Sequence, residues 1–401
     1  MKKRIGIVGA GILGLAIAWK LQERLPEAMV MVFEKEAGPG SHQSSHNSGV
    51  LHCGLYYQPG SLKARLAVEG IRSMIDFCRQ HNLPHDVCGK VVVASGDRER
   101  RFLEDLAGRG AANGLKGLAF LSQSELRRRE PYVWASDALL VPEEGIVDYQ
   151  AVMDTLATLI RQRGGKIFFD SRVSGLKPQP AGGGVVLATT RNEVPLDLLV
   201  CCAGLFSDRL YHKCTGLIPP LRIIPFRGEY RMLRPGAERM VNHLVYPVPD
   251  PVYPFLGVHF TRLVHGGREV GPNAVLALRR EGYRKSSFSL QDTADSLSYP
   301  GFRRFVSKNL RFTAGEIASS VSDKVFLAKA RKMIPDLTPD QLAPGTAGVR
   351  AQALAADGSL VMDFRIMRHG RQIHVLNAPS PGATASLAIA SHIVAEYTNQ
   401  F

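Results

Sequence analysis

The chain begins with a short apolar run that gives way to a helical pattern. In "KRIGIVGAGILGLAIAWKLQ", the apolar run ends at Val8, and apolar residues at helical spacing follow Gly14. Between them, Gly9, Gly11 and Gly14 have the spacing G-x-G-x-x-G. In this motif the first glycine permits a sharp turn, the second lets a pyrophosphate approach the backbone, and the third lets the helix pack closely. The pattern predicts a strand–turn–helix unit that binds the phosphates of a dinucleotide at the helix N-terminus.

A second apolar strand, "MVMVFEKE", reaches an acidic residue at Glu34. This acid follows Gly14 by about 20 residues, the spacing at which a carboxylate accepts hydrogen bonds from the adenosine ribose. A negative charge there disfavours a 2′-phosphate, so NADP is not expected. The motif alone does not distinguish NAD from FAD as the bound dinucleotide.

Apolar runs that end in small residues recur in the middle and near the end of the chain. "LDLLVCCAGLFSDRL" runs into Ala203 and Gly204 before a helix, and a strand at Ile373–Leu376 leads into "NAPSPGATAS". Small residues at a strand end let the backbone approach a ligand closely. The helix after the second run could place its dipole near the electron-rich edge of a flavin.

Other runs, rich in β-branched and aromatic residues, predict a second sheet. They lie at Lys90–Ser95, Arg222–Leu233, Phe255–Leu263 and Ala274–Arg279. We therefore predict an α/β protein with a discontinuous Rossmann-like FAD-binding domain and a second α+β domain on a mixed or antiparallel sheet. The FAD-binding domain is expected at 1–85, 145–222 and 342–401, and the substrate or capping domain at 86–144 and 223–341.

The segment "HQSSHNSGVLHCGLYYQPGSLKARL" fits neither a core strand nor an ordinary amphipathic helix. It follows Glu34 closely and is rich in hydroxyl, amide and imidazole groups. Such groups could donate hydrogen bonds to the phosphates and the ring carbonyls of an FAD extended along the sheet. The segment therefore favours FAD over NAD.

Composition narrows the class of protein only slightly. The 401 residues include 45% hydrophobic ones, without an apolar run of the ~20 residues that a membrane span requires. We expect a mature soluble chain with reduced cysteines and without a metal site, because its six cysteines have no CxxC spacing and its histidines and acids do not recur at ligand spacing. The net charge of +14 suits nucleic acid, an anionic membrane or an acidic substrate.

Several unusual stretches resemble one known family. The chain is similar to FAD-dependent oxidoreductases of the glycine-oxidase and D-amino-acid-oxidase type, and most similar to bacterial L-2-hydroxyglutarate dehydrogenases. The stretches that carry the resemblance include "SSHNSGVLHCGLYYQPGSLKA", "PFRGEYR", "VGPNAVLALRREGY", "AGVRAQ" and "NAPSPGATAS". Sarcosine oxidases often tether FAD through a late cysteine, but this chain has none beyond Cys214.

The resemblance implies an enzyme that oxidises L-2-hydroxyglutarate to 2-oxoglutarate, with hydride transfer to flavin N5 and electrons passed to a membrane quinone or a similar acceptor. A related flavin enzyme acting on glycerol 3-phosphate or on an amino acid is the main alternative. An RNA-binding flavoprotein is a rival from another class, but we see no basic-aromatic recognition module and expect no nucleic-acid partner.

The motif, the polar segment and the resemblance together assign the residues expected to bind FAD. They are Gly9, Gly11, Ile12, Leu13, Gly14, Glu34, Lys35, Gln43, Ser44, Ser45, His46, Asn47, Ser48, Gly49, Val50, His52, Val173, Ala203, Gly204, Pro381, Gly382, Ala383 and Thr384.

Arginines are the first candidates for holding a dicarboxylate, because their planar fork makes two parallel charge-assisted hydrogen bonds. The resemblance implies that Arg350 faces the substrate carboxylate beside the flavin. Arg227 and Arg279 lie on predicted strands and could bind either carboxylate, although surface ion pairs would explain them equally well. Tyr57 and Tyr230 could donate phenolic hydrogen bonds or simply pack in the core.

A histidine suits removal of a hydroxyl proton at neutral pH. His259 alternates with apolar Val258 and Phe260, so it faces a cleft or solvent, and we take it as the candidate base. His52 and His46 are expected to contact the flavin or its pyrophosphate. A structural role for any of these histidines stays open.

"GFRRFVSKNLRF" predicts a basic amphipathic helix with Phe302, Phe305, Val306 and Leu310 near one face. Such a helix can lie on an anionic membrane, or it can pack its aromatic face into the core. Together with the family's quinone-linked chemistry, it suggests a cytoplasmic protein that is peripheral on the inner face of the cell membrane.

Overall fold

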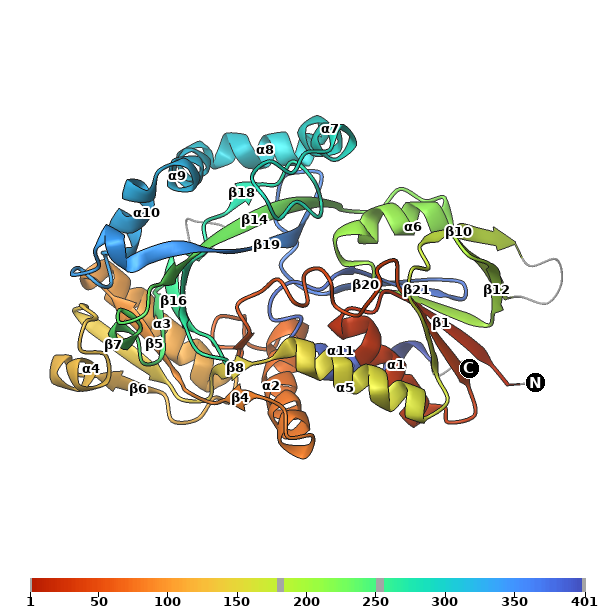
Figure 1. The fold of residues 1–401 in the computed structure, drawn as a ribbon, viewed down its shortest axis with the longest axis horizontal. Helices are drawn as coiled ribbons and strands as arrows, with labels where there is room; N and C mark the ends of the chain where they lie inside the picture. The colour runs from red at the N-terminus through yellow and green to blue at the C-terminus, as the bar shows by residue number, and fades with distance from the viewer. Residues whose placement is uncertain (1, 179–183, 250–255, 399–401) are drawn as a thin grey trace.

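A mostly parallel sheet collects strands from distant parts of the chain (Figure 1). The computed structural model describes residues 2–178, 184–249 and 256–398. The strand order is β20-β21-β13-β1-β2-β9, and every neighbouring pair is parallel except the β20–β21 hairpin. The strands are β1 (Arg4–Val8), β2 (Met29–Phe33), β9 (Lys166–Phe168), β13 (Leu198–Cys201), β20 (Arg365–His369) and β21 (Gln372–Asn377).

Helices cover this sheet with small and aliphatic side chains. The helix α1 (Ile12–Arg24) packs against α5 (Tyr149–Gln162) and α11 (Ser386–Tyr397), and α2 (Leu62–Gln80) packs against α11. Small residues such as Ala16 and Ala18 on α1 are fully buried and let the helices approach closely. The predicted strand–turn–helix unit at the amino terminus is confirmed by β1 and α1.

Two small sheets and one helix lie beside the parallel sheet. One sheet joins β10 (Val173–Pro178), β11 (Val185–Thr189) and β12 (Glu193–Leu196), and the other joins β3 (Val50–Leu51), β8 (Gly145–Val147) and β4 (His85–Asp86). After β13 the chain makes a 3₁₀ turn and enters α6 (Ser207–Thr215), as the sequence predicts.

A nine-stranded mixed sheet forms the second part of the molecule. Its order is β18-β14-β17-β16-β15-β5-β7-β6, with β19 paired to β14. The strands are β5 (Lys90–Ala94), β6 (Ala119–Leu121), β7 (Asp137–Val141), β14 (Arg222–Leu233), β15 (Leu244–Pro247), β16 (His259–Arg262), β17 (Arg268–Gly271), β18 (Val275–Leu276) and β19 (Leu342–Leu354).

The strand predictions for this sheet differ in accuracy. The span of β14 agrees with the prediction, and β5 differs from it by one residue. The predicted strand Ala274–Arg279 is largely wrong, because only Val275–Leu276 pair before the chain turns. Of the predicted strand at 255–263, residue 255 lies outside the described residues, and the remainder contains β16.

Helices lie on the outer side of the large sheet and at its edge. In Figure 1, α7 (Leu290–Ser298), α8 (Pro300–Lys308), α9 (Leu310–Val321) and α10 (Asp323–Ala330) follow β14 and β19 along the upper rim. The remaining helices are α3 (Asp97–Ala112), which packs on β5 and β7, and α4 (Gln123–Arg129).

The expected single helix over residues 301–312 is wrong. The chain breaks between α8 and α9 at Asn309, so Leu310 begins a new helix and is 63% exposed. Phe302 and Phe305 are buried against Phe226 of β14. The aromatic face of α8 therefore packs into the core.

The predicted division into two domains stays a prediction. The strand β19 starts where the last predicted FAD segment starts, at Leu342, and it belongs to the large sheet rather than the parallel one. It lies alongside β14 from one end to the other (Figure 1). Among the described residues, no helix is long and apolar enough to cross a membrane.

Candidate active site

The glycine turn after β1 has the geometry that its spacing predicts. Gly9 has φ of +101°, which only glycine adopts without strain. A Cβ added to Gly14 would lie 2.0 Å from the carbonyl oxygen of Gly9, so the helix can approach the strand only without a side chain. At Gly11 an added Cβ would come within 3.1 Å of Ser44 Oγ, which itself accepts the backbone N–H of Ile12 at 3.0 Å. The space before the α1 N-terminus is therefore lined by backbone and a hydroxyl.

Glu34 anchors the end of β2 to this turn. Its Oε2 accepts the N–H of Ala10 at 2.7 Å, and its Oε1 accepts the N–H of Glu36 at 3.0 Å. An ionised carboxylate has about four acceptor positions. Two therefore stay available for ribose hydroxyls, and the predicted role of Glu34 fits its geometry.

The polar segment before β3 folds as a series of turns held by its own side chains. Ser45 Oγ donates to the carbonyl of Gly40 at 2.7 Å, and Asn47 Nδ2 donates to the carbonyls of Gln43 and Ser44. Gly49 turns the chain with φ of +66° into β3. These bonds keep the segment beside the α1 N-terminus, where the predicted cofactor contacts would be made.

The loop between β21 and α11 is joined to the same segment. Thr384 Oγ1 donates to the carbonyl of Val50 at 3.1 Å and accepts the N–H of His52 at 3.2 Å. Gly382 lies where a Cβ would come within 2.6 Å of the carbonyl of Ala378, so the loop can adopt this tight form only with glycine there. The neighbouring predicted contacts, Pro381 and Ala383, lie in this loop.

The remaining predicted cofactor residues flank the α1 turn. Gly204 has φ of +51°, and a Cβ there would come within 2.7 Å of Gln43 Oε1. Val173 and Ala203 pack against the side-chain cluster at the end of β1 and β2. The backbone at the end of β13 therefore approaches the polar segment directly.

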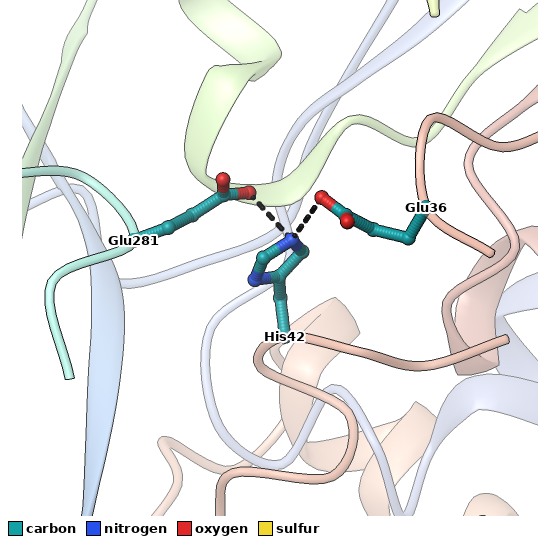
Figure 2. A group of neighbouring side chains, drawn as sticks. All are labelled: Glu36, His42 and Glu281. Atoms are coloured by element: carbon teal, nitrogen blue, oxygen red, sulfur yellow. Dashed lines mark hydrogen bonds and ion pairs between the residues drawn. The ribbon is translucent and has the colours of Figure 1, made fainter. Parts of the chain in front are cut away.

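An ion cluster around Lys35 joins the two sheets. Glu36 and Glu281 both face His42 Nε2 (Figure 2), and the distances are 2.9 and 3.0 Å. These three groups resemble a ligand set for a metal ion. However, Lys35 Nζ pairs with both carboxylates and lies 2.8 Å from the same nitrogen. The ammonium thus supplies the positive charge, and the cluster ties the loop after β18 to the predicted cofactor segment.

Ring contacts strengthen this connection. Tyr283 stacks on His46 with ring centroids 4.0 Å apart, and its hydroxyl lies 3.2 Å from His42 Nδ1. The hydrogen bonds from Lys35 and His42 lower the pKa of Glu36 to about 2. The loop at 281–283 therefore closes over residues that the sequence assigns to FAD.

The predicted substrate groups Arg350 and Tyr230 meet at the edge of that segment. The Tyr230 hydroxyl hydrogen-bonds to the side chains of Arg350 and Ser48. Burial raises the pKa of Tyr230 to about 12, although the cationic Arg350 opposes the rise. A Cβ at Gly348 would come within 2.4 Å of the carbonyl of His46, so β19 lies directly against the segment. A neutral phenol and a cation therefore face the predicted flavin position together.

His259 is buried near this group, but its environment does not suit a base. Its Nδ1 donates to the carbonyl of Gly257 at 2.9 Å, and its ring stacks on Tyr246 at 4.0 Å. Burial, together with the charges of Arg350 and Lys90, lowers the pKa of His259 to about 3, although the bond to Gly257 opposes the change. The imidazole is therefore neutral at physiological pH and is a weak proton acceptor.

The other two predicted arginines have different surroundings. Arg227 Nε and Nη2 bond to Glu229 Oε1, at 3.2 and 2.9 Å, and its Nη1 donates to the carbonyl of Arg284. Arg279 is exposed. Arg227 is thus occupied by Glu229 and Arg279 lies at the surface, and we assign neither of them a substrate contact.

Arg280 and Lys63 are buried cations that were not singled out from the sequence. Arg280 is 1% exposed and forms an ion pair with Asp208 of α6, with Nη2 and Oδ2 2.9 Å apart. Lys63 lies 4.6 Å from the ring of Tyr57, and burial lowers its pKa to about 8. Tyr57 hydrogen-bonds to Ser380, which joins it to the loop before α11 that carries other predicted cofactor contacts.

Comparison with known proteins gives consistent results. The profile of the family described as FAD dependent oxidoreductase (DAO) matches residues 4–396. L-2-hydroxyglutarate dehydrogenase of Escherichia coli K12 is 44% identical over 391 residues, covering 97% of this chain and 92% of the relative. The mitochondrial L-2-hydroxyglutarate dehydrogenase of Homo sapiens is 40% identical over 413 residues, covering 99% and 89%. L-alpha-glycerophosphate oxidase of Mycoplasma pneumoniae, solved with FAD bound, superposes with a TM-score of 0.78 at 23% identity, covering 99% and 95% of the two chains.

Proposed function

This chain belongs to the FAD-dependent oxidoreductase family that contains the L-2-hydroxyglutarate dehydrogenases, and from that premise we propose that it oxidises L-2-hydroxyglutarate to 2-oxoglutarate. FAD is its cofactor. The observation that carries the proposal is the meeting of Arg350 and Tyr230 beside Ser48 of the cofactor segment. A cation and a phenol there can hold the carboxylate of a 2-hydroxy acid.

The residues around the glycine turn would hold the dinucleotide. The α1 N-terminus and Ser44 offer donors to the pyrophosphate, and Glu34 offers acceptors to the ribose. When bound, FAD accepts the two electrons that leave the substrate carbon. The protein supplies binding, orientation and removal of the hydroxyl proton.

Arg350 gives the substrate its orientation. Its guanidinium can form two charge-assisted hydrogen bonds to one carboxylate, and the Tyr230 hydroxyl can supply a third. Because the pKa of Tyr230 is raised by burial, its proton stays in place as a donor at neutral pH. The substrate's carboxylate would then be fixed relative to the segment that carries the cofactor contacts.

Of His52 and His259, His52 is the better proton acceptor, and we assign it the role of base in place of His259. Its Nδ1 lies 3.5 Å from the carboxylate of Glu144. Burial lowers the pKa of His52, and Lys90 and Lys63 lower it too, but the carboxylate of Glu144 opposes the change. An efficient base has a pKa near the operating pH. The negative charge of Glu144 moves the pKa of His52 in that direction, whereas for His259 only the bond to the carbonyl of Gly257 does so.

A substrate panel tests this function. Purified protein with an artificial dye acceptor should form 2-oxoglutarate from L-2-hydroxyglutarate, and much more slowly from the D form. Glycerol 3-phosphate and L-glutamate serve as the competing substrates. Faster dye reduction with either of them than with L-2-hydroxyglutarate would overturn the proposal.

We further propose that electrons pass to a quinone at an anionic membrane surface. Along α9, Leu310, Ile317 and Val321 are exposed, at 63%, 54% and 78%, and recur on one side of the helix. Exposed basic residues stand nearby at Arg303, Arg304, Lys308 and Arg311. An apolar stripe beside basic side chains is typical of helices that lie in a membrane interface.

Liposome flotation distinguishes this surface from a solvated helix. The protein should float with vesicles that contain anionic lipid and less with neutral ones. The double variant Ile317→Asp with Val321→Asp should lose this association, because both charges would enter the interface. Phe120→Asp, at an exposed aromatic residue on β6, is the matched control and should float as the parent does. Equal flotation of the double variant and the parent would contradict the assignment.

A further inference from the structure

A fully buried ion pair lies directly behind His52. Lys90, the first residue of β5, pairs with Glu144, which precedes β8, and both side chains are 0% exposed. Glu144 Oε1 also lies 3.4 Å from both the N–H and the Sγ of Cys53. Lys90 Nζ lies 4.1 Å from the ring of Tyr246. The pair therefore sits between the cofactor segment and the large sheet.

Such a pair is difficult to explain by stability. Lysine and glutamate are almost never fully buried unless they are paired, and even then desolvation can cost as much as the attraction between the charges returns. Replacement of a buried pair by apolar residues is often neutral or stabilising. A role in the chemistry of the neighbouring imidazole would account for the pair.

We propose that Glu144, held ionised by Lys90, orients His52 and fixes its proton on Nδ1, so that Nε2 is left as the proton acceptor. The catalytic role of this arrangement rests on the proposed function, but the position of the proton on His52 can be measured without any substrate. Glu144 and Lys90 are positioning residues, since they act through His52.

The geometry supports the orientation. Glu144 Oε2, the oxygen that pairs with Lys90, is 3.5 Å from His52 Nδ1, and this nitrogen has no ordinary hydrogen bond among the described residues. This separation is longer than a formed hydrogen bond, and catalytic hydrogen bonds often tighten only when substrate binds. The His52 backbone is already fixed by Thr384. A small movement of the ring would therefore close the contact.

The charge of Glu144 is maintained by its partners. Burial would raise the pKa of Glu144, but Lys90 and His52 lower it to about 2. The carboxylate therefore stays negative and does not compete for the proton that His52 takes up. Other titratable or charged groups also act on this imidazole from neighbouring elements: Lys63 of α2, His259 of β16 and the adjacent thiol of Cys53.

Two substitutions should shift the pH profile in the same direction by different amounts. Glu144→Gln removes the charge that favours protonated His52, so the acidic limb of kcat should move to lower pH, with a plateau reduced by about tenfold or more. Lys90→Met removes the cation that keeps the buried Glu144 ionised, so the limb should also move to lower pH. This shift should be smaller, because the repulsion between Lys90 and protonated His52 is lost as well. A purely structural pair would reduce activity in both variants without moving the limb, and that result would overturn the inference.

Controls separate this effect from misfolding and from a wrong substrate. Glu143→Gln, at the neighbouring partly exposed carboxylate, should retain the parent profile. The double variant Glu144→Gln with Lys90→Met leaves no unpaired buried charge, so it should fold even where Lys90→Met does not.

Nitrogen-15 NMR of protein with labelled histidines measures the tautomer directly. The signals of His52 are identified as those that disappear in the variant His52→Asn. Neutral His52 should carry its proton on Nδ1 in the parent and lose this preference in Glu144→Gln. An Nε2–H tautomer in the parent would overturn the inference whatever the substrate proves to be. If His52 carries its proton on Nδ1 but the substrate panel does not favour L-2-hydroxyglutarate, only the proposed function is contradicted.

Discussion

Replacement of Arg350 by methionine should lower kcat/KM for L-2-hydroxyglutarate by about 10²- to 10⁴-fold. The reason is the loss of two charge-assisted hydrogen bonds to the substrate carboxylate, worth roughly 1.5–3 kcal/mol each. Loss of the bond to Tyr230 would also release the phenol that helps to orient the substrate. Steady-state kinetics with a dye acceptor measure the change, and the flavin spectrum checks that the cofactor is still bound.

Arg350→Lys distinguishes the contribution of the positive charge from that of the planar guanidinium group. Lysine keeps the positive charge but cannot form the two parallel bonds, so its kcat/KM should lie between those of the parent and Arg350→Met. Arg128→Met, at an exposed arginine on α4, is the control for loss of one positive charge and should be unaffected. A kcat/KM for Arg350→Met close to that of the parent would remove Arg350 from the substrate site.

Replacement of Arg280 by methionine should lower the free energy of unfolding by about 3–5 kcal/mol, because it leaves the buried Asp208 carboxylate without its partner. The pair connects the loop after β18 with α6 beside the parallel sheet. Asp208 also accepts the backbone N–H of Ile223 at 3.0 Å, so the carboxylate is part of the joint between the two sheets. Urea unfolding followed by circular dichroism measures the loss.

The neighbouring residue provides the control for this prediction. Arg279→Met removes the same side chain from an exposed position and should change stability by no more than about 0.5 kcal/mol. The double variant Asp208→Asn with Arg280→Met removes both charges and should recover part of the loss. If Arg280→Met and Arg279→Met unfold at the same urea concentration, the buried pair does not hold the two parts together.

Local patterns predicted the parts of the fold that depend on local physics. The glycine turn followed from spacing, because Gly14 is required by its contact with Gly9 within the same strand–turn–helix unit and Gly9 by its positive φ. The long strand β14 followed from its β-branched and aromatic run. By contrast, the break at Asn309 between α8 and α9 was missed, since basic and aromatic residues continue at helical spacing across it.

The candidate site shows where sequence reasoning ends. Arg279 and Arg280 are adjacent, and nothing in their local pattern tells which one is buried against Asp208. Likewise, His52, Lys90 and Glu144 come from three separate segments, and only the tertiary fold brings them together. From the sequence alone, a lysine and a glutamate are expected to be solvated surface residues. Both were therefore missed.

Anaerobic titration of the purified protein with L- and D-2-hydroxyglutarate tests the central claim most directly, because it reports cofactor, substrate and handedness together. The protein should be yellow, and the L form should bleach its flavin absorbance at about 450 nm with one substrate per flavin, while the D form leaves it unchanged. A colourless protein that FAD cannot reconstitute, or a yellow one that the L form does not bleach, would contradict the account.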